Sequence, residues 1–135
     1  MLEVLPIQTK AEQEAYCARC NVKYYPELMA YHAMIDGVLA GVCQLTMNEN
    51  GGSIRARGLS EDAEKLSAHD RFEALFVMGR ATLNFIDLCG VHIAYFDATD
   101  FTDEQTVRAI GFKKNDDGRY AMDLTNFFEH PCSHE

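Results

Sequence analysis

The sequence predicts an α/β domain in which a mixed sheet of six to seven strands is flanked by helices. Short apolar runs alternate with turn-forming residues, and longer segments combine helix-capping residues with an apolar face. One strand-like run directly follows the longest of these helices, a connection typical of parallel neighbouring strands. With 135 residues, 47% of them hydrophobic, the chain can form one core, so we expect a single domain over 1–135 that includes a C-terminal tail at 125–135.

The first half is expected to hold one helix and an antiparallel meander. Thr9 and Glu12 have the spacing of a capping box, which predicts a helix over 10–21. The pair Asp36-Gly37 suits a tight hairpin turn, and the Asn- and Gly-rich residues at 48–52 suit a second turn. The strands expected around these features are 2–7, 28–35, 38–47 and 53–59.

The second half begins with a polar connection at 60–69 and continues into a long helix. Asp70 with Glu73 predicts the capped start of that helix, and Gly90 predicts its end. The near-continuous apolar run at 91–96 is typical of a central strand that is covered on both faces. We therefore expect a strand, a crossover helix and a parallel strand in this part of the chain.

A shorter helix and a last hairpin complete the predicted elements. The residues from Thr102 to Gln105 repeat the capping spacing, and Gly111 predicts the end of the helix. The turn sequence Asp116-Asp117-Gly118 predicts a hairpin between strands at 112–115 and 120–124.

Composition excludes several classes of partner. The formal net charge of −9 disfavours nucleic acid and anionic membrane surfaces. The sequence has neither an apolar stretch of membrane-spanning length nor a signal-peptide pattern, so we expect a cytoplasmic protein without a membrane partner. The odd count of five cysteines fits a reducing compartment. Phe127 and Phe128 leave two interpretations open, cover for the core or self-association into a homodimer.

The element order and the end of the chain resemble those of a known enzyme superfamily. The stretch at 109–113, a helix closing on Gly-Phe, followed by a turn and the strand at 120–124, resembles the ending of the GNAT superfamily of acyl-CoA-dependent N-acyltransferases. The likeness covers essentially the whole chain. It implies transfer of an acyl group from acetyl-CoA or another acyl-CoA to a small-molecule amine or a peptide amine.

The resemblance also implies a cofactor site at the start of the long helix. In that superfamily the diphosphate lies on backbone amides in a Gln/Arg-x-x-Gly-x-Gly/Ala loop, where the helix dipole favours an anion. The stretch Gly79-Arg80-Ala81 matches the Gly-x-Ala part of this loop. Counting back from Gly90 by the usual length of the superfamily's helix places the loop at 70–75 instead, where Arg71 is the basic residue. The expected cofactor-binding residues are therefore Arg71, Gly79 and Arg80.

Two features point instead to a binding or structural module that has the GNAT fold but does not catalyse acyl transfer. Carboxylates of Asp70 and Glu73 would occupy the amides that a diphosphate needs. The superfamily's Tyr near the final Gly-Phe corresponds to Val107, and its Asn after the buried strand falls near Asp100. No catalytic residue is assigned, and the candidates for a general base are His32, His92, Tyr95 and Asp97.

A third hypothesis is a zinc-stabilised domain. Cys17 and Cys20 form a Cys-x-x-Cys pair, and Cys132 and His134 could supply two further ligands if the tail folded back. Cys-x-x-Cys zinc ligands usually occupy a turn, whereas this pair falls in a predicted helix. Zinc is therefore the less favoured alternative to free thiols.

Arg55 and Arg57 are two residues apart in a predicted strand and are expected on one face of it. Two interpretations remain open: an anionic ligand, or a solvated and salt-bridged strand face.

Overall fold

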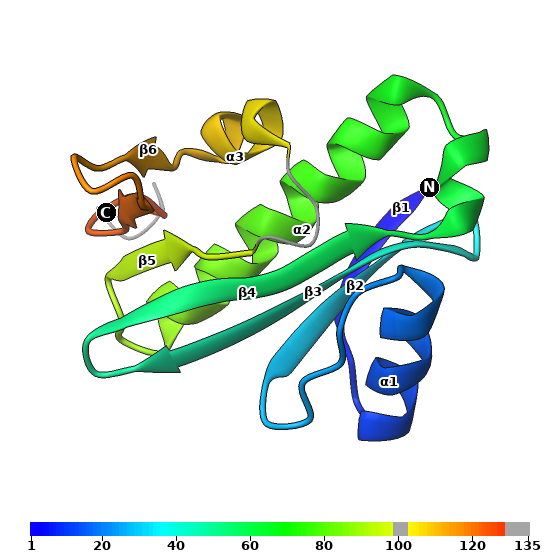
Figure 1. The fold of residues 1–135 in the computed structure, drawn as a ribbon, viewed down its shortest axis with the longest axis horizontal. Helices are drawn as coiled ribbons and strands as arrows, with labels where there is room; N and C mark the ends of the chain where they lie inside the picture. The colour runs from blue at the N-terminus through cyan, green and yellow to red at the C-terminus, as the bar shows by residue number, and fades with distance from the viewer. Residues whose placement is uncertain (99–102, 129–135) are drawn as a thin grey trace, which may run out of the picture.

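The computed structural model describes residues 1–98 and 103–128. Its strands form one seven-stranded mixed sheet in the order β1-β2-β3-β4-β5-β7-β6 (Figure 1). This arrangement confirms the predicted fold class. The strands are β1 (Leu2–Pro6), β2 (Met29–Ile35), β3 (Val38–Asn48), β4 (Gly51–Leu59), β5 (Ile93–Phe96), β6 (Lys113–Lys114) and β7 (Tyr120–Asp123). The helices are α1 (Lys10–Arg19), the 3₁₀ helix η1 (Glu61–Lys65), α2 (Ala68–Leu88) and α3 (Glu104–Ile110).

The predicted turns set the order of the sheet. Asp36 and Gly37 have φ angles of 51° and 82°, so the β2–β3 hairpin turns as expected. Gly118 has a φ of 87° in the β6–β7 turn. The crossover through α2 makes β4 and β5 parallel, as the sequence predicted.

The two faces of the sheet are covered by different helices. Residues of α2 and α3, among them Met78 and Ile110, pack with the sheet in the larger core cluster. Cys17 of α1 packs with Val42 and Ala56 in a smaller cluster. Figure 1 shows α1 apart from α2 and α3, and we call the two sides of the sheet the α1 face and the α2 face.

Two predicted helix caps are wrong by one to three residues. Ser67, not Asp70, is the N-cap of α2, and its hydroxyl accepts a hydrogen bond from the Asp70 amide at 3.0 Å. The sequence did not indicate this first turn because Ala68 and His69 are exposed and lie outside the apolar stripe. Asp103 is the N-cap of α3, whereas Thr102, the expected cap, lies outside the described residues.

The prediction that the 91–96 strand is covered on both faces is also wrong. β5 begins at Ile93, whose exposed fraction is 38%, and Tyr95 is half-buried, whereas Ala94 and Phe96 are buried. The α2 face of this strand is therefore covered and the other face remains partly open. The apolar run did not reveal this difference because it contains large hydrophobic residues on both faces.

A buried polar cluster fixes the segment between α1 and β2. The Gln44 carboxamide oxygen accepts hydrogen bonds from Gln13 Nε2 and from the Tyr25 amide, each at 2.9 Å. Gln44 Nε2 donates to the Lys23 carbonyl at 2.7 Å, and Gln13 Nε2 also lies 3.2 Å from the Leu28 carbonyl. Both glutamines are buried, with exposed fractions of 0% and 2%. This cluster ties the 23–28 segment to the middle of the sheet.

Within the described part of the chain, every helix is too short or too polar to cross a bilayer.

Candidate functional site

The neighbouring strands β4 and β5 separate halfway along β4. They pair only from Gly52 to Ile54 and from Ala94 to Phe96, and the Asp97 amide then donates to the Ile54 carbonyl at 2.9 Å. The strand β4 continues to Leu59 without a β5 partner. Among the residues at 1–98 and 103–128, the second half of β4 therefore presents an edge at the centre of the sheet.

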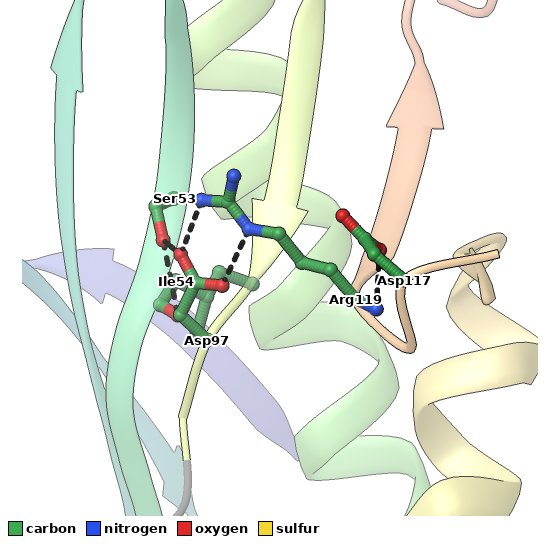
Figure 2. A network of polar contacts seen from close by, with 5 residues as sticks. All are labelled: Ser53, Ile54, Asp97, Asp117 and Arg119. Atoms are coloured by element: carbon green, nitrogen blue, oxygen red, sulfur yellow. Dashed lines mark hydrogen bonds and ion pairs between the residues drawn. The ribbon is translucent and has the colours of Figure 1, made fainter. Parts of the chain in front are cut away.

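A hydrogen-bonded network holds the strand ends together where the separation begins. Figure 2 shows the Asp97 carboxylate between Ser53 of β4 and Arg119, which precedes β7. Asp97 accepts from Arg119 Nε at 2.9 Å, from Arg119 Nη2 at 2.8 Å and from Ser53 Oγ at 2.6 Å. The Arg119 guanidinium also stacks 3.7 Å from the centre of the Tyr95 ring. Asp97 thus links the strands on both sides of β5 through a bidentate ion pair.

The partners of Asp97 favour its ionised form. The hydrogen bonds from Arg119 are the main cause that lowers the pKa of Asp97 below its ordinary value, and partial burial opposes them. The hydrogen bonds to Asp97 raise the pKa of Arg119. A carboxylate with a lowered pKa is a weak proton acceptor, so Asp97 suits the binding of a cation better than general-base catalysis.

We expect the Asp97–Arg119 pair to stabilise the fold only above acidic pH. A carboxyl whose pKa is lower in the folded state contributes its full stabilisation above the unfolded-state pKa and loses it as the pH falls through the folded-state value. Because 44% of the Arg119 side chain is exposed, solvent screening limits the contribution to about 1 kcal/mol.

The measurement is the difference in the free energy of unfolding between wild type and Asp97→Asn. It should be constant from about pH 5 to 7 and shrink below about pH 4. A difference that grew on acidification would contradict the assignment.

Asp97 and Arg119 form a wall shared by two cavities. The larger cavity, of about 580 Å³, lies between the end of β5, the start of β7 and the start of α3, next to Val107. The smaller cavity, of about 260 Å³, includes Arg55 and Tyr95. Because both cavities include Asp97 and Arg119, these two side chains divide the region beside the β4 edge.

The larger cavity also contains a tyrosine that the sequence analysis missed. The Tyr120 hydroxyl is hydrogen-bonded to the Glu104 carboxylate. This bond raises the pKa of Tyr120 and lowers the pKa of Glu104. Val107 of α3 lines the same cavity. Tyr120 therefore places a phenol near the position where the superfamily resemblance leads one to expect a tyrosine. The residue has no sequence motif that could have indicated the contact.

The four candidate bases do not all lie together. Tyr95 and Asp97 share the Arg119 contact, whereas His92 pairs with Asp87 at 2.7 Å on the surface. His32 lies in β2 beside the Tyr16 ring of α1, and burial lowers its pKa. Asp100 lies outside the described residues.

The start of α2 offers little to a diphosphate. Ser67 already accepts from the Asp70 amide, Arg71 donates to the Leu66 carbonyl, and Glu73 lies 3.6 Å from His69 rather than over the helix amides. From residue 60 to residue 75 the sequence has no glycine, five carboxylates and two cations other than histidine. The cap prediction for Asp70 and Glu73 was wrong, but the surroundings remain acidic.

The three predicted cofactor residues are not brought together. Arg71 lies in the first turn of α2, whereas Gly79 and Arg80 lie more than two turns further along it. A Cβ on Gly79 would lie 2.5 Å from Ile110 Cδ1, and Arg80 Nε donates to the Ile110 carbonyl at 2.9 Å. Gly79 and Arg80 therefore connect α2 to α3. The partner of Gly79 is thus the helix α3 rather than a diphosphate-binding loop.

This contact predicts a compensating pair of substitutions. Gly79→Ala should lower the free energy of unfolding by about 1 kcal/mol, because overpacking against Ile110 exceeds the gain in helix propensity. In an Ile110→Val background the clashing methyl group is gone, so the same substitution should be neutral or stabilising. Urea denaturation of the four proteins measures the coupling, and equal losses in both backgrounds would contradict the proposed contact.

The two strand arginines lie on opposite faces, contrary to the prediction. In the β3–β4 register Leu45 pairs with Ile54 and Gln44 with Ala56, so Arg55 is the extra residue of a β-bulge. The bulge breaks the two-residue alternation. Arg55 is exposed and lines the smaller cavity, whereas Arg57 is 2% exposed and lies 4.7 Å from the centre of the Phe96 ring.

The described residues contain no cluster of three or more potential metal ligands. Cys17 and Cys20 are buried, and burial raises the pKa of Cys20 to about 12, which disfavours the thiolate that zinc requires. Cys132 and His134 lie outside the described residues. At the end of the described chain, Phe128 packs on the core and Phe127, with an exposed fraction of 39%, lies beneath Arg80.

Comparison with known proteins identifies the fold. No family model matches the sequence, and no curated protein matches it in sequence. Three of the solved structures that match are acetyltransferases. The ribosomal-protein-S18-alanine N-acetyltransferase from Escherichia coli has a TM-score of 0.61 at 11% identity, over 92% of this chain and 94% of that one. The putative N-acetyltransferase YhhK from E. coli, bound to coenzyme A, has a TM-score of 0.55 at 14% identity, over 91% and 98%. Nourseothricin acetyltransferase has a TM-score of 0.57 at 12% identity, over 89% and 94%.

The chain therefore has the fold of the GNAT acetyltransferases over nearly its whole described length.

Proposed function

We propose that the protein is an N-acyltransferase that transfers an acyl group from acetyl-CoA or another acyl-CoA to a small amine. The observation that carries this proposal is the separation of β4 from β5 beside two cavities, within a fold shared with acetyltransferases. Direct attack of the amine on the thioester would need donor and acceptor to meet at such an opening.

The residues fit one end of acyl-CoA better than the other. The edge of β4 beyond Ile54 can pair with the amide groups of a pantetheine arm, and the wall of Asp97 and Arg119 borders it. The diphosphate would have only the α2 start, with Arg71 and Lys65 nearby. When bound, acyl-CoA supplies an activated thioester. The ionised Asp97 would hold the cationic amine at the wall, and water would take its proton before attack.

A second candidate function is a ligand-binding module of the same fold without catalysis. The glycine-free, acidic segment from 60 to 75 favours it, because glycine lets a phosphate approach the backbone and carboxylates repel it.

Calorimetric titration with acetyl-CoA and desulfo-CoA separates the two functions. For the acyltransferase we expect binding of both compounds, weakened about fivefold in Arg71→Ala and unchanged in Arg80→Ala, whose guanidinium serves the α2–α3 contact. Free thiol released from acetyl-CoA with a panel of amines reports the transfer. If neither acetyl-CoA nor desulfo-CoA binds at millimolar concentration and no thiol is released, the acyltransferase is excluded and the non-catalytic module is the function that is retained.

A further inference from the structure

The smaller cavity is a polar groove on the α1 face of the sheet. It is bordered by the β3–β4 turn, the first half of β4, Tyr95 and Arg119. Its volume of about 260 Å³ is below the range of about 300 Å³ and more that is typical of drug-sized ligands. A groove of this size suits a small molecule.

The charge of the groove is opposite to that of the protein. Among the described residues its charged members are Arg55, Arg119 and Asp97, so two cations face one carboxylate in a chain of formal net charge −9. Asp97 Oδ2 accepts from both Ser53 and Arg119, whereas Oδ1 accepts from Arg119 Nε, so most of the carboxylate is engaged and one of its about four lone-pair sites is left for an ammonium group. Thr46, Asn48 and Asn50 add uncharged polar side chains. The local field and the available donors therefore favour an anionic group.

A β-bulge places Arg55 in the groove without Arg57. Without the extra residue in β4, the alternation would place Arg55 and Arg57 on the same face. Arg55 lies two residues after Ser53, whose hydroxyl donates to Asp97, and is therefore on the side of Asp97, whereas the bulge turns Arg57 to the other face. The positive charge of Arg55 contributes to the lowered pKa of the Asp97 carboxyl. Bulges occur often next to functional sites, where they separate side chains that would otherwise share a face.

We infer that this groove binds the carboxylate of an acceptor of amino-acid size, with Arg55 as the anion-binding side chain, so that the acceptor's amine lies at the Asp97–Arg119 wall. The inference rests on the proposed function, because it names the acceptor class of that transfer. Asp97 then faces the ammonium group while Arg55 faces the carboxylate, and the amine reaches the β4 edge from the α1 face. An amine without an acidic group would lack the second contact.

Three compounds of matched shape test the acceptor class without any acyl donor. L-alanine carries both groups, ethylamine lacks the carboxylate and propionate lacks the amine. In ¹⁵N-resolved NMR titrations we expect alanine to shift the amide signals of Gly51, Gly52 and Arg55. Propionate should shift the same signals, and ethylamine should bind at least about tenfold more weakly than alanine.

Arg55→Ala should weaken alanine binding about tenfold, and Arg55→Lys should restore part of it. Arg19→Ala is the matched control, because it removes the same charge at the end of α1, where Arg19 pairs with Asp62. Equal affinity for ethylamine and alanine, unchanged binding in Arg55→Ala, or no shift with any compound would each overturn the inference.

Measuring thiol release from acetyl-CoA distinguishes failure of the carboxylate site from failure of the proposed acyltransferase function. Acylation of ethylamine as fast as alanine would retain the transferase and overturn the carboxylate site. Alanine binding in the groove without acylation of any amine would retain the carboxylate site and overturn the transferase.

Discussion

Replacing Gln44 with leucine is expected to lower the free energy of unfolding by about 3 kcal/mol. The side chain is fully buried and makes three hydrogen bonds, to Gln13, to the Tyr25 amide and to the Lys23 carbonyl. Leucine has a similar volume but leaves these three groups without that partner, and each unsatisfied buried group costs about 1–3 kcal/mol before relaxation. Urea denaturation followed by far-ultraviolet circular dichroism measures the change.

Gln8→Leu is the matched control. Gln8 is exposed and its only described side-chain hydrogen bond is a long one to the Pro6 carbonyl, so the loss should stay below about 0.5 kcal/mol. Gln13→Leu combined with Gln44→Leu should cost less than the sum of the two single changes, because the two side chains are partners. A strictly additive result, or a change below about 1 kcal/mol for Gln44→Leu, would show that the cluster contributes little to stability.

Asp97→Asn is expected to lower kcat/KM for acyl transfer about 100-fold, or roughly 2.7 kcal/mol. The substitution conserves the volume of the side chain but removes the charge that holds Arg119 and, in the proposed function, the ammonium group. The loss should fall on kcat and on KM for the amine, whereas the affinity for acyl-CoA should change little. A purely structural role of Asp97 would not lower kcat and raise KM for the amine while leaving the affinity for acyl-CoA unchanged.

Two variants complete the measurement. Asp62→Asn removes the same charge from an exposed pair with Arg19 and should leave kcat/KM unchanged. Asp97→Glu keeps the charge and should restore part of the rate. Equal rates for wild type and Asp97→Asn, at equal folded fraction, would exclude Asp97 from the site.

The candidate site could be predicted only in part because its contacts join distant segments. Tyr95 and Asp97 were candidates because one lies in a predicted central strand and the other directly follows it, but Arg119, 22 positions after Asp97, was not a candidate. Tyr120 and Glu104 come together only because the fold brings the start of α3 near the start of β7. A charged residue in a turn sequence looks solvated until the partner strand is known.

The local features of the fold were readable from the sequence by itself. Backbone sterics within a few residues decide the positive φ at Gly37, Gly111 and Gly118. A short-range hydrogen bond decides the N-cap at Thr9. These signals were enough to predict the sheet, its parallel crossover and the resemblance in element order.

Only the tertiary structure decided which side chains face the site. The bulge at Arg55 arises from the pairing of β4 with β3, and it reverses the face on which one arginine lies relative to the other. The partners of Asp97 depend on β5 ending where β4 continues. Strand register and strand length are set by packing of the whole sheet, because every residue of a strand competes with neighbours that are far away in the sequence.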